Sequence, residues 1–237
     1  TVLPDQCVAF YLGGSLALGD FHPQHSDIDF VAVTSGELAP AAIAALRAMH
    51  EELWGTGMFW LRKLDGSYVP RHVIRQWNAS HTPCPFVERD TFTVTQQGSA
   101  LIQRQILYDH GITVAGPDPR QLLDSLEPGE LRRGLHEMLE RWWRPLLDNP
   151  DWIQPIQNQP FAILSLCRAL YTLEHGVVAS KPVAASWAQQ VLDVRYMEPI
   201  AWALAWPREM SVDQLDTTLD LIRYTLERYA RYDERAR

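Results

Sequence analysis

Two short segments near the beginning of the chain, Gly14-Ser15 and residues 26–29 (Ser-Asp-Ile-Asp), restrict the possible folds more than any other feature of these 237 residues. An apolar run over residues 8–12 precedes the first segment, and a run rich in β-branched and aromatic residues over 28–33 continues from the second. Both runs are typical of β-strands. We therefore predict two strands joined by a loop, with a glycine turn after the first strand and two carboxylates at the start of the second.

The two carboxylates, Asp27 and Asp29, are separated by one residue, so in an extended strand their side chains share a face with Cα atoms roughly 6.5–7 Å apart. Such a pair suits Mg²⁺, which prefers carboxylate oxygens and keeps phosphate oxygens as further ligands. The backbone N–H groups of Gly14 and Ser15 and the serine hydroxyl are suited to holding phosphate. An isolated Asp-x-Asp also occurs as two solvated acids at the end of a strand. The glycine turn, with eleven residues between Ser15 and Asp27, favours the metal site.

The spacing of apolar residues predicts a small α/β domain over the first half of the chain. The elements expected after the second strand are a helix over 40–53, extended segments over 58–64 and 68–73, a helix from about Ser99 to Asp109, and a strand over 112–114. Strands alternating with helices indicate an α/β (α+β) domain with a small mixed sheet. We place the end of this domain at the Gly116-Pro117 turn, so that it covers residues 1–117.

Residues 118–237 are predicted to form an all-α helical bundle. Apolar residues at spacings of three and four predict helices over 131–142, 161–175 and 183–194, and a long final helix that begins at Ser211 as its N-cap. The apolar stripe of the final helix either covers the bundle or forms a dimer seam. We therefore expect a monomer or a weak dimer.

Charge and cysteine content restrict the partners and the compartment. The net charge of −8 argues against binding to nucleic acid, which requires clustered Lys and Arg. The three cysteines, Cys7, Cys84 and Cys167, form no CxxC pattern and fit reduced thiols in a cytoplasm. No apolar run approaches the roughly 20 residues that span a bilayer. We expect a cytoplasmic protein that binds neither nucleic acid nor membrane.

The glycine turn and the carboxylates also resemble a known signature. Gly14-Ser15, Gly19 and residues 26–31 (Ser-Asp-Ile-Asp-Phe-Val) are similar to the motif of the DNA polymerase β-like nucleotidyltransferase superfamily. The resemblance implies that Asp27 and Asp29 bind two divalent cations and that a third carboxylate on a neighbouring strand completes the site. Asp65 is our candidate for this third metal ligand and for the catalytic base. Aminoglycoside adenylyltransferases usually have Glu there, which is one methylene longer.

A second resemblance lies in the helical half. Residues 164–171 (Leu-Ser-Leu-Cys-Arg-Ala-Leu-Tyr), Gly176 and Ser180-Lys181 resemble the C-terminal domain of the streptomycin/spectinomycin adenylyltransferases. The resemblance implies that Arg168 and Lys181 contact the triphosphate of a nucleotide, together with Gly14, Ser15 and Ser26 of the first half. Without the resemblance, Arg168 on an apolar helix is equally an ion-pair partner.

These resemblances imply an antibiotic-resistance enzyme that uses ATP and two Mg²⁺ ions to transfer AMP to a hydroxyl of a cationic, aminoglycoside-type acceptor. The acids and the imidazole that hold the drug in streptomycin-modifying enzymes are replaced here by residues 157–161 (Gln-Asn-Gln-Pro-Phe). Glu88, Asp90 and Glu174 are acids that could take their place. Two alternatives stay open: the same chemistry on another small molecule or a protein, and a non-catalytic nucleotide-binding module, because Asp65 is the shorter acid.

Overall fold

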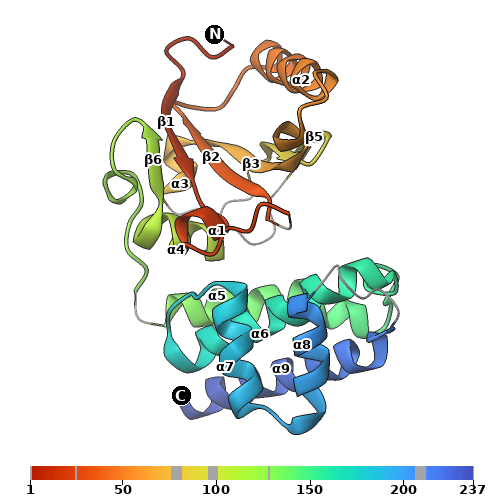
Figure 1. The fold of residues 1–237 in the computed structure, drawn as a ribbon. Coiled ribbons are helices and arrows are strands. Elements are labelled where there is room, and N and C mark those ends of the chain that lie inside the picture. Colours follow the sequence, from red (N-terminus) through yellow and green to blue (C-terminus); the bar gives the residue numbers. More distant parts are fainter. Residues whose placement is uncertain are drawn as a thin grey trace. The chain divides into compact units, whose positions relative to one another are not determined.

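The computed structural model describes residues 2–24, 26–75, 82–95, 101–127, 129–205 and 212–236. The chain forms two compact units, Thr1–Leu126 and Glu127–Arg237, called here the N-terminal and C-terminal units. The N-terminal unit contains a six-stranded mixed sheet with helices, and every element described in the C-terminal unit is helical (Figure 1). The predicted fold class is therefore confirmed.

The sheet has the strand order β5-β4-β3-β2-β1-β6. Its strands are β1 (Cys7–Leu12), β2 (Ile28–Thr34), β3 (Leu64–Pro70), β4 (Cys84–Glu88), β5 (Thr91–Thr95) and β6 (Ile112–Ala115). β2 and β3 pair in parallel, whereas the other neighbouring strands pair antiparallel. The crossover between the parallel strands runs through the helix α2 (Pro40–Gly55) and the 3₁₀ helix η1 (Phe59–Lys63).

Alternate residues of β2 face two separate hydrophobic cores. Phe30 and Ala32 pack in one core with residues of α2, including Leu46 and Trp54. Val31 and Val33 pack in the other core with α3 (Arg71–Ile74) and α4 (Leu101–His110), to which Val73, Ile74 and Leu107 belong. Helices therefore bury both faces of the central strands, which explains the continuous apolar run over residues 30–33.

Two parts of the N-terminal unit differ from the sequence prediction. Residues 58–64 were expected to be extended, but residues 59–63 form η1, and Met58 and Phe59 are 58% and 56% exposed. The helical turn lets the Trp54 indole donate a hydrogen bond to the carbonyl of Leu61, 3.1 Å away. The segment expected over 68–73 is also shorter, because β3 ends at Pro70 and α3 begins at Arg71.

The hairpin formed by β4 and β5 was not predicted. Its two-residue turn is Arg89-Asp90, whereas short hairpin turns usually carry Gly, Asn or Asp where φ is positive. Arg89 adopts a φ of +56° without being glycine, so the sequence gives no turn signal at this position.

The C-terminal unit is built around the helix α6 (Gln159–His175), which has ten buried residues and packs against α7 (Lys181–Val191), α8 (Met197–Ala205) and α9 (Leu215–Ala236). The hydroxyl of Tyr229 on α9 donates a buried hydrogen bond of 2.7 Å to the carbonyl of Ala169 on α6. This bond and the apolar packing fix α6 in the middle of the unit.

Several helix ends in the second half were misplaced. The helix predicted over 131–142 is α5 (Glu130–Met138) followed by a π-helical turn over Leu139–Trp143, and Pro145, which has no N–H, lies in the next turn. The helix predicted over 183–194 is α7, which begins two residues earlier at Lys181 and ends at Val191. α8 was not predicted. The helix starts expected at Ser99 and Ser211 lie outside the described residues.

The segment after Pro117 packs with the N-terminal unit. The Tyr11 hydroxyl donates a hydrogen bond of 2.7 Å to the carbonyl of Pro117, and Leu122 and Leu123 belong to the core of the sheet. The functional division at residues 117–118 stays a prediction. All three cysteines are free thiols, as expected. Among the described helices, none combines the length and the apolar character needed to cross a bilayer.

His50 should make the stability of the N-terminal unit depend on pH. Its imidazole is 2% exposed and lies 2.8 Å from the Tyr68 hydroxyl oxygen, and burial lowers its pKa. The unfolded chain takes up a proton near pH 6.5 that the folded unit excludes, so the free energy of unfolding falls as the pH drops from about 7 towards the lowered pKa. We expect His50→Phe to show a shallower fall in urea midpoint, followed by circular dichroism between pH 7 and pH 5.

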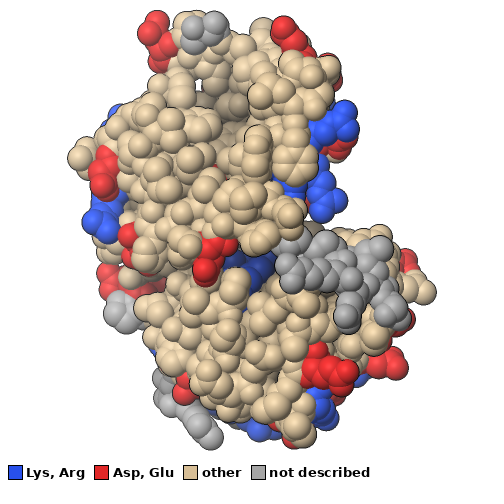
Figure 2. Space-filling model, in the orientation of Figure 1, with Lys and Arg blue, Asp and Glu red and all other residues tan. Residues whose placement is uncertain are grey.

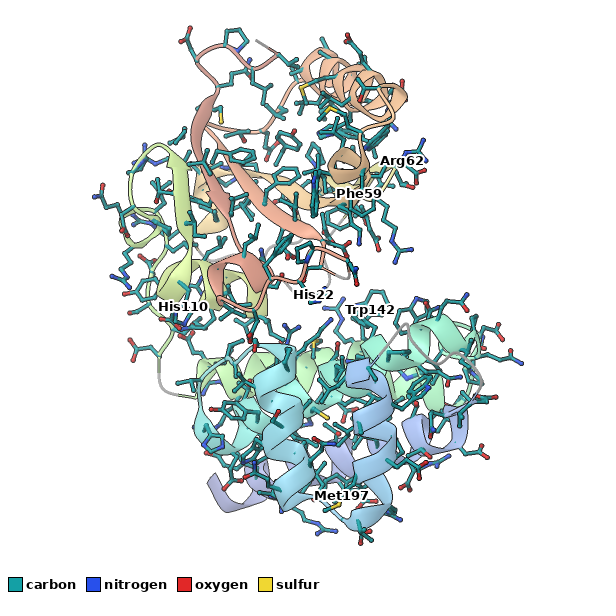
Figure 3. All side chains as sticks on the ribbon, viewed as in Figure 1. His22, Phe59, Arg62, His110, Trp142 and Met197 are labelled. Atoms are coloured by element: carbon teal, nitrogen blue, oxygen red, sulfur yellow. The ribbon has the colours of Figure 1, made fainter. Side chains whose placement is uncertain are left out.

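The matched control is His110→Gln, which changes an exposed histidine of the same unit (Figure 3). This variant should keep the wild-type pH dependence. Equal slopes for the wild type and His50→Phe would contradict the role of His50.

Candidate active site

The glycine turn after β1 places Gly14 directly against a carboxylate. The N–H of Gly13 donates a hydrogen bond of 3.0 Å to the carbonyl of Asp29, which ties the end of β1 to the start of β2. Gly14 has a φ of +52°, and a Cβ added there would lie 1.8 Å from Oδ2 of Asp29. Only glycine therefore allows the Asp29 carboxylate to approach the turn this closely.

Three neighbouring strands bring three carboxylates to the same end of the sheet. Asp29 on β2 is paired with Asp65 on β3, and Asp65 is paired in turn with Glu88 on β4. Directly paired residues place their side chains on the same face of a sheet. This face also carries Val31 and the helix α4. Asp29 and Asp65 are therefore neighbours on adjacent strands, as expected, and Glu88 is the next residue along the same face.

Asp27 lies just outside the strand that was expected to contain it. β2 begins at Ile28, so the alternation of a strand does not set the direction of the Asp27 side chain. Its carboxylate is 3.9 Å from the ammonium of Lys63, which also donates a hydrogen bond of 3.4 Å to the carbonyl of Gln24. Sequence reasoning missed Lys63 as a site residue, because only the crossover through η1 brings it beside Asp27.

The loop before Asp27 is closed by Ser26. The Ser26 hydroxyl accepts a hydrogen bond of 2.9 Å from the N–H of His22, and the Ser26 N–H donates one of 2.8 Å to the His22 carbonyl. The hydroxyl proton of Ser26 can still be donated to a phosphate oxygen. Figure 3 shows His22 in this exposed loop, and the neighbouring His25 lies outside the described residues. Ser15 is half-buried in the short helix α1 (Gly14–Ala17).

The donor atoms at this end of the sheet fit Mg²⁺ when it arrives with a polyphosphate. In the part of the chain that the structure describes, no three His, Cys, Asp or Glu side chains gather closely enough to hold a metal by themselves. Mg²⁺ is usually held by one or two carboxylates together with substrate phosphates, so a closed protein cage is not required. The Asp29 carboxylate itself takes the space that a Cβ at Gly14 would fill, so this donor lies directly against the glycine turn. The predicted roles of Asp27, Asp29 and Asp65 as metal ligands stay predictions.

The two remaining nucleotide-binding candidates lie in the C-terminal unit. Arg168 is half-buried in the middle of α6, between the buried residues Cys167 and Ala169. Lys181 is the first residue of α7, and its Nζ lies 3.8 Å from the centroid of the Phe161 ring. Phe161 was not among the predicted site residues, because an exposed aromatic residue gives no signal in the sequence.

The segment 157–161, where the expected acids are missing, has a structural role of its own. Gln159 is fully buried, and its amide donates a hydrogen bond of 2.7 Å to the Asp213 carboxylate. Its side-chain oxygen accepts a bond of 2.7 Å from the N–H of Gln214. Gln159 therefore joins the start of α6 to the segment before α9.

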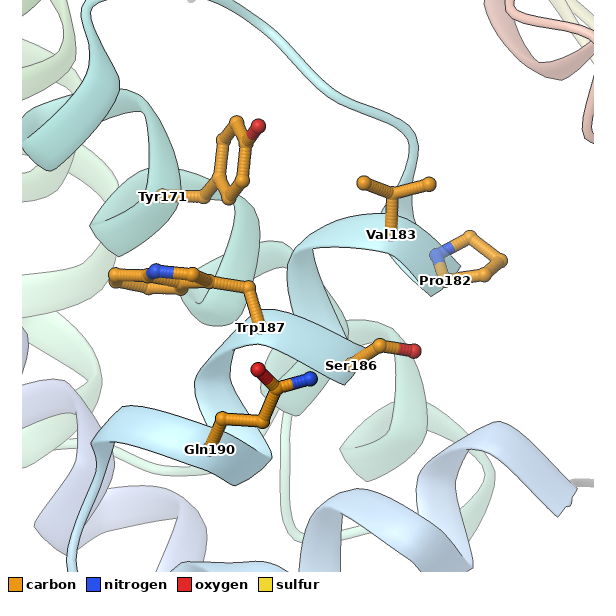
Figure 4. Close-up of a pocket in the computed structure, with 6 residues that line it drawn as sticks. All are labelled: Tyr171, Pro182, Val183, Ser186, Trp187 and Gln190. Carbon is orange, nitrogen blue, oxygen red and sulfur yellow. The ribbon is translucent and has the colours of Figure 1, made fainter.

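A hollow of about 360 Å³ opens between α6 and α7 in the C-terminal unit (Figure 4). It is lined by Tyr171, Pro182, Val183, Ser186, Trp187 and Gln190. None of these residues carries a charge, so the hollow offers no group for a triphosphate or a polycation. On the face of the molecule in Figure 2, acidic and basic side chains are dispersed among uncharged ones.

Comparison with known families agrees with the two sequence resemblances. Residues 5–57 match the nucleotidyltransferase domain family, and residues 121–231 match the family described as aminoglycoside adenylyltransferase, C-terminal domain. These two segments are therefore similar to a nucleotidyltransferase domain and to the C-terminal domain of aminoglycoside adenylyltransferases. The family resemblance predicted from the sequence is confirmed.

The curated relatives align with about two fifths of this chain. The aminoglycoside (3'') (9) adenylyltransferase of Klebsiella pneumoniae is 33% identical over 92 residues, which are 39% of this chain and 32% of the relative. The enzyme of the same name from Rhizobium radiobacter is 31% identical over 88 residues, 37% of this chain and 30% of the relative. The aligned segments thus span about a third of these relatives.

A solved structure shares the fold over almost the whole chain. The crystal structure of spectinomycin adenyltransferase AAD(9) from Enterococcus faecialis with ATP and spectinomycin matches with a TM-score of 0.72. The match covers 97% of this chain and 94% of that one at 18% sequence identity. At this identity the likeness establishes the fold.

Because Gly14 lies so close to Asp29, we expect that adding a single methyl group at Gly14 disturbs ligand binding. We expect Gly14→Ala to displace the Asp29 carboxylate and to weaken binding of ATP with Mg²⁺ by about tenfold or more, measured by titration calorimetry. Gly19→Ala is the matched control, because Gly19 also has a positive φ of +74° but a Cβ there meets nothing within 4 Å. Equal losses in both variants would show that backbone strain, and not the contact with Asp29, determines the effect.

Proposed function

We propose that the protein is a Mg²⁺-dependent nucleotidyltransferase that transfers AMP from ATP to a hydroxyl of an aminoglycoside-type antibiotic and releases pyrophosphate. The observation that carries this proposal is the pairing of Asp29 with Asp65 beside Gly14, in a chain whose residues 5–57 and 121–231 match the two domain families. The solved relative that shares the fold was crystallised with ATP and spectinomycin. The three free thiols support a reducing cytoplasm as its compartment.

Each predicted residue has a role in this reaction. Gly14, Ser15 and Ser26 would hold phosphate oxygens, and the guanidinium of Arg168 and the ammonium of Lys181 would donate further hydrogen bonds to the triphosphate. The carboxylates of Asp27, Asp29 and Asp65 would hold two Mg²⁺ ions. Bound ions supply charge neutralisation for the phosphates and lower the pKa of the acceptor hydroxyl.

The protein groups also have to position the acceptor and remove its proton. Asp65 would accept the proton of the hydroxyl as its oxygen forms the new bond to the α-phosphorus and the bond to pyrophosphate breaks. Asp65 is paired on one side with Asp29 and on the other with Glu88. Since Asp29 and the glycine turn lie on the β2 side of Asp65, we place the acceptor on its other side, towards β4.

Glu88 is our candidate for the group that recognises a positive charge on the acceptor. It is exposed and lies at the end of β4, on the side of Asp65 away from the phosphate turn. A carboxylate in this place can pair with an ammonium group of an aminoglycoside or aminocyclitol. Glu88 would thereby take over part of the task of the acids missing from residues 157–161.

Two other functions stay open on specific grounds. The missing acids favour a different acceptor, either another small molecule or a protein, for the same chemistry. The shorter reach of Asp65 favours a non-catalytic nucleotide-binding module. Modified protein without any modified drug would support the first alternative, and tight binding of ATP without turnover would support the second.

The metal-binding carboxylates can be tested directly. The wild-type protein should convert streptomycin or spectinomycin, with ATP and Mg²⁺, to a product heavier by one adenylyl group, detected by mass spectrometry. We expect Asp27→Ala and Asp29→Ala each to lower pyrophosphate release by roughly 10²- to 10³-fold or more, the cost of removing an electrostatic stabiliser. Thermal unfolding should be nearly unchanged, because neither aspartate is fully buried and the Asp27–Lys63 pair is partly exposed.

The role of Glu88 can be separated from that of the metal ligands by its kinetic signature. Glu88→Gln should lower kcat/KM for a cationic acceptor by about tenfold or more, the value of a hydrogen bond to a charged group, while KM for ATP stays unchanged. Asp90→Asn is the matched control, since it removes an exposed acid from the adjacent turn. A loss that appears in kcat alone would assign Glu88 to the chemistry, and no loss would remove it from the site.

A further inference from the structure

Lys181, one of the nucleotide-binding candidates, contacts the face of an aromatic ring, that of Phe161. The Nζ atom lies 3.8 Å from the ring centroid, well within the roughly 6 Å over which a ring face attracts a cation. Lys181 is one of two lysines in the chain, so few other ammonium groups could replace it. The ring therefore contributes to where this charge lies.

The path of the chain brings Lys181 to the beginning of α6. Lys181, at the start of α7, meets Phe161 in the first turn of α6. Further along α7, Trp187 contacts Tyr171 and His175, with ring centroids 5.5 and 5.4 Å apart. α7 therefore follows α6 in the same general direction. The segment that joins them runs back along α6, as seen in the close-up of Tyr171 and Trp187 (Figure 4).

The main chain at Lys181 is held in place, but this does not determine the position of its ammonium group. Ser180 is buried, and its hydroxyl caps α7 by accepting a hydrogen bond from the N–H of Val183. The ammonium of a lysine stands on a flexible stem of four carbons, so it can take many positions from one backbone position. A contact near the end of the stem, such as the one with the Phe161 ring, restricts these positions.

The ring of Phe161 packs against one tryptophan, Trp152, which packs in turn against a second, Trp143. Trp152 meets it nearly edge-on, with centroids 5.8 Å apart and planes at 79°. Trp152 meets Trp143 in the same way at 6.4 Å and 84°, and Trp143 is buried. Phe161 is itself 49% exposed, so a cation and a ligand beside it remain accessible.

Phe161 also shares a helix face with the other nucleotide-binding candidate. Arg168 follows it by seven residues, which is two turns of α6 and nearly the same angular position. Arg168 and Phe161, on which the ammonium of Lys181 lies, thus belong to one face of α6. An ammonium has three N–H donors, so contact with a ring on one side leaves donors for phosphate oxygens on the other.

We propose that Phe161 is a positioning residue for Lys181, whose ring holds the ammonium in the place where it meets the triphosphate. The inference rests on the proposed function, because it takes Lys181 as a contact of the nucleotide. It adds a residue that acts on nucleotide affinity without contacting the nucleotide through a charged group. A pre-placed ammonium loses less conformational freedom when the nucleotide binds.

A double-mutant cycle tests the coupling between the two side chains. Phe161→Leu keeps an apolar side chain but removes the ring face, and it should raise both the Kd and the KM for ATP about two- to fivefold, with kcat and the acceptor KM unchanged. Phe161→Tyr should restore the wild-type values. In a Lys181→Met background, Phe161→Leu should have no further effect. Trp142→Leu, at a side chain that is 57% exposed, is the matched control and should change nothing.

The outcomes separate this inference from the proposed function. If the wild type binds ATP, Lys181→Met binds it weakly and Phe161→Leu binds it as the wild type does, the inference fails and the proposed function stands. Equal losses from Phe161→Leu in the presence and absence of Lys181 would also overturn it, because the ring would then act by itself. A wild-type protein that neither binds ATP nor adenylylates an acceptor would refute the proposed function.

Discussion

The parallel pairing of β2 with β3 is the constraint on which the candidate site depends. It places Asp65 beside Asp29, although 35 residues lie between them in the sequence, and the crossover through α2 and η1 brings Lys63 to Asp27. The antiparallel pairing of β3 with β4 then adds Glu88 to the same face. Asp29, Asp65 and Glu88 thus lie at paired positions of three neighbouring strands.

Much of this site could be predicted because its signals are local. The end of β1, the glycine turn and the start of β2 all lie between residues 12 and 29. Asp65 was expected on the neighbouring strand from the family resemblance. The sequence indicated Glu88 as a candidate but not its position in the sheet. The hairpin that carries it turns at Arg89, which has a positive φ although it is not a glycine, so no turn was predicted there. Long-range pairing, and not local preference, determines its position.

In the helical half, too, local sequence patterns predicted a helix but not its tertiary contacts. The apolar periodicity of α6 predicted the helix within two residues at its start. The same pattern could not show that Gln159 would be buried as a link to Asp213 and Gln214, or that Phe161 would contact the ammonium of Lys181. Both contacts join residues far apart in the sequence, so they depend on the completed fold.

The scarcity of lysine gives the two ammonium groups a significance beyond their individual contacts. Lys63 lies beside Asp27 in the N-terminal unit, and Lys181 lies on Phe161 in the C-terminal unit. Every other positively charged side chain of fixed charge is an arginine. An acylating reagent that is selective for side-chain amines therefore has two targets in this sequence, one beside Asp27 and one on the ring of Phe161. Each unit therefore has a single lysine that can be labelled selectively.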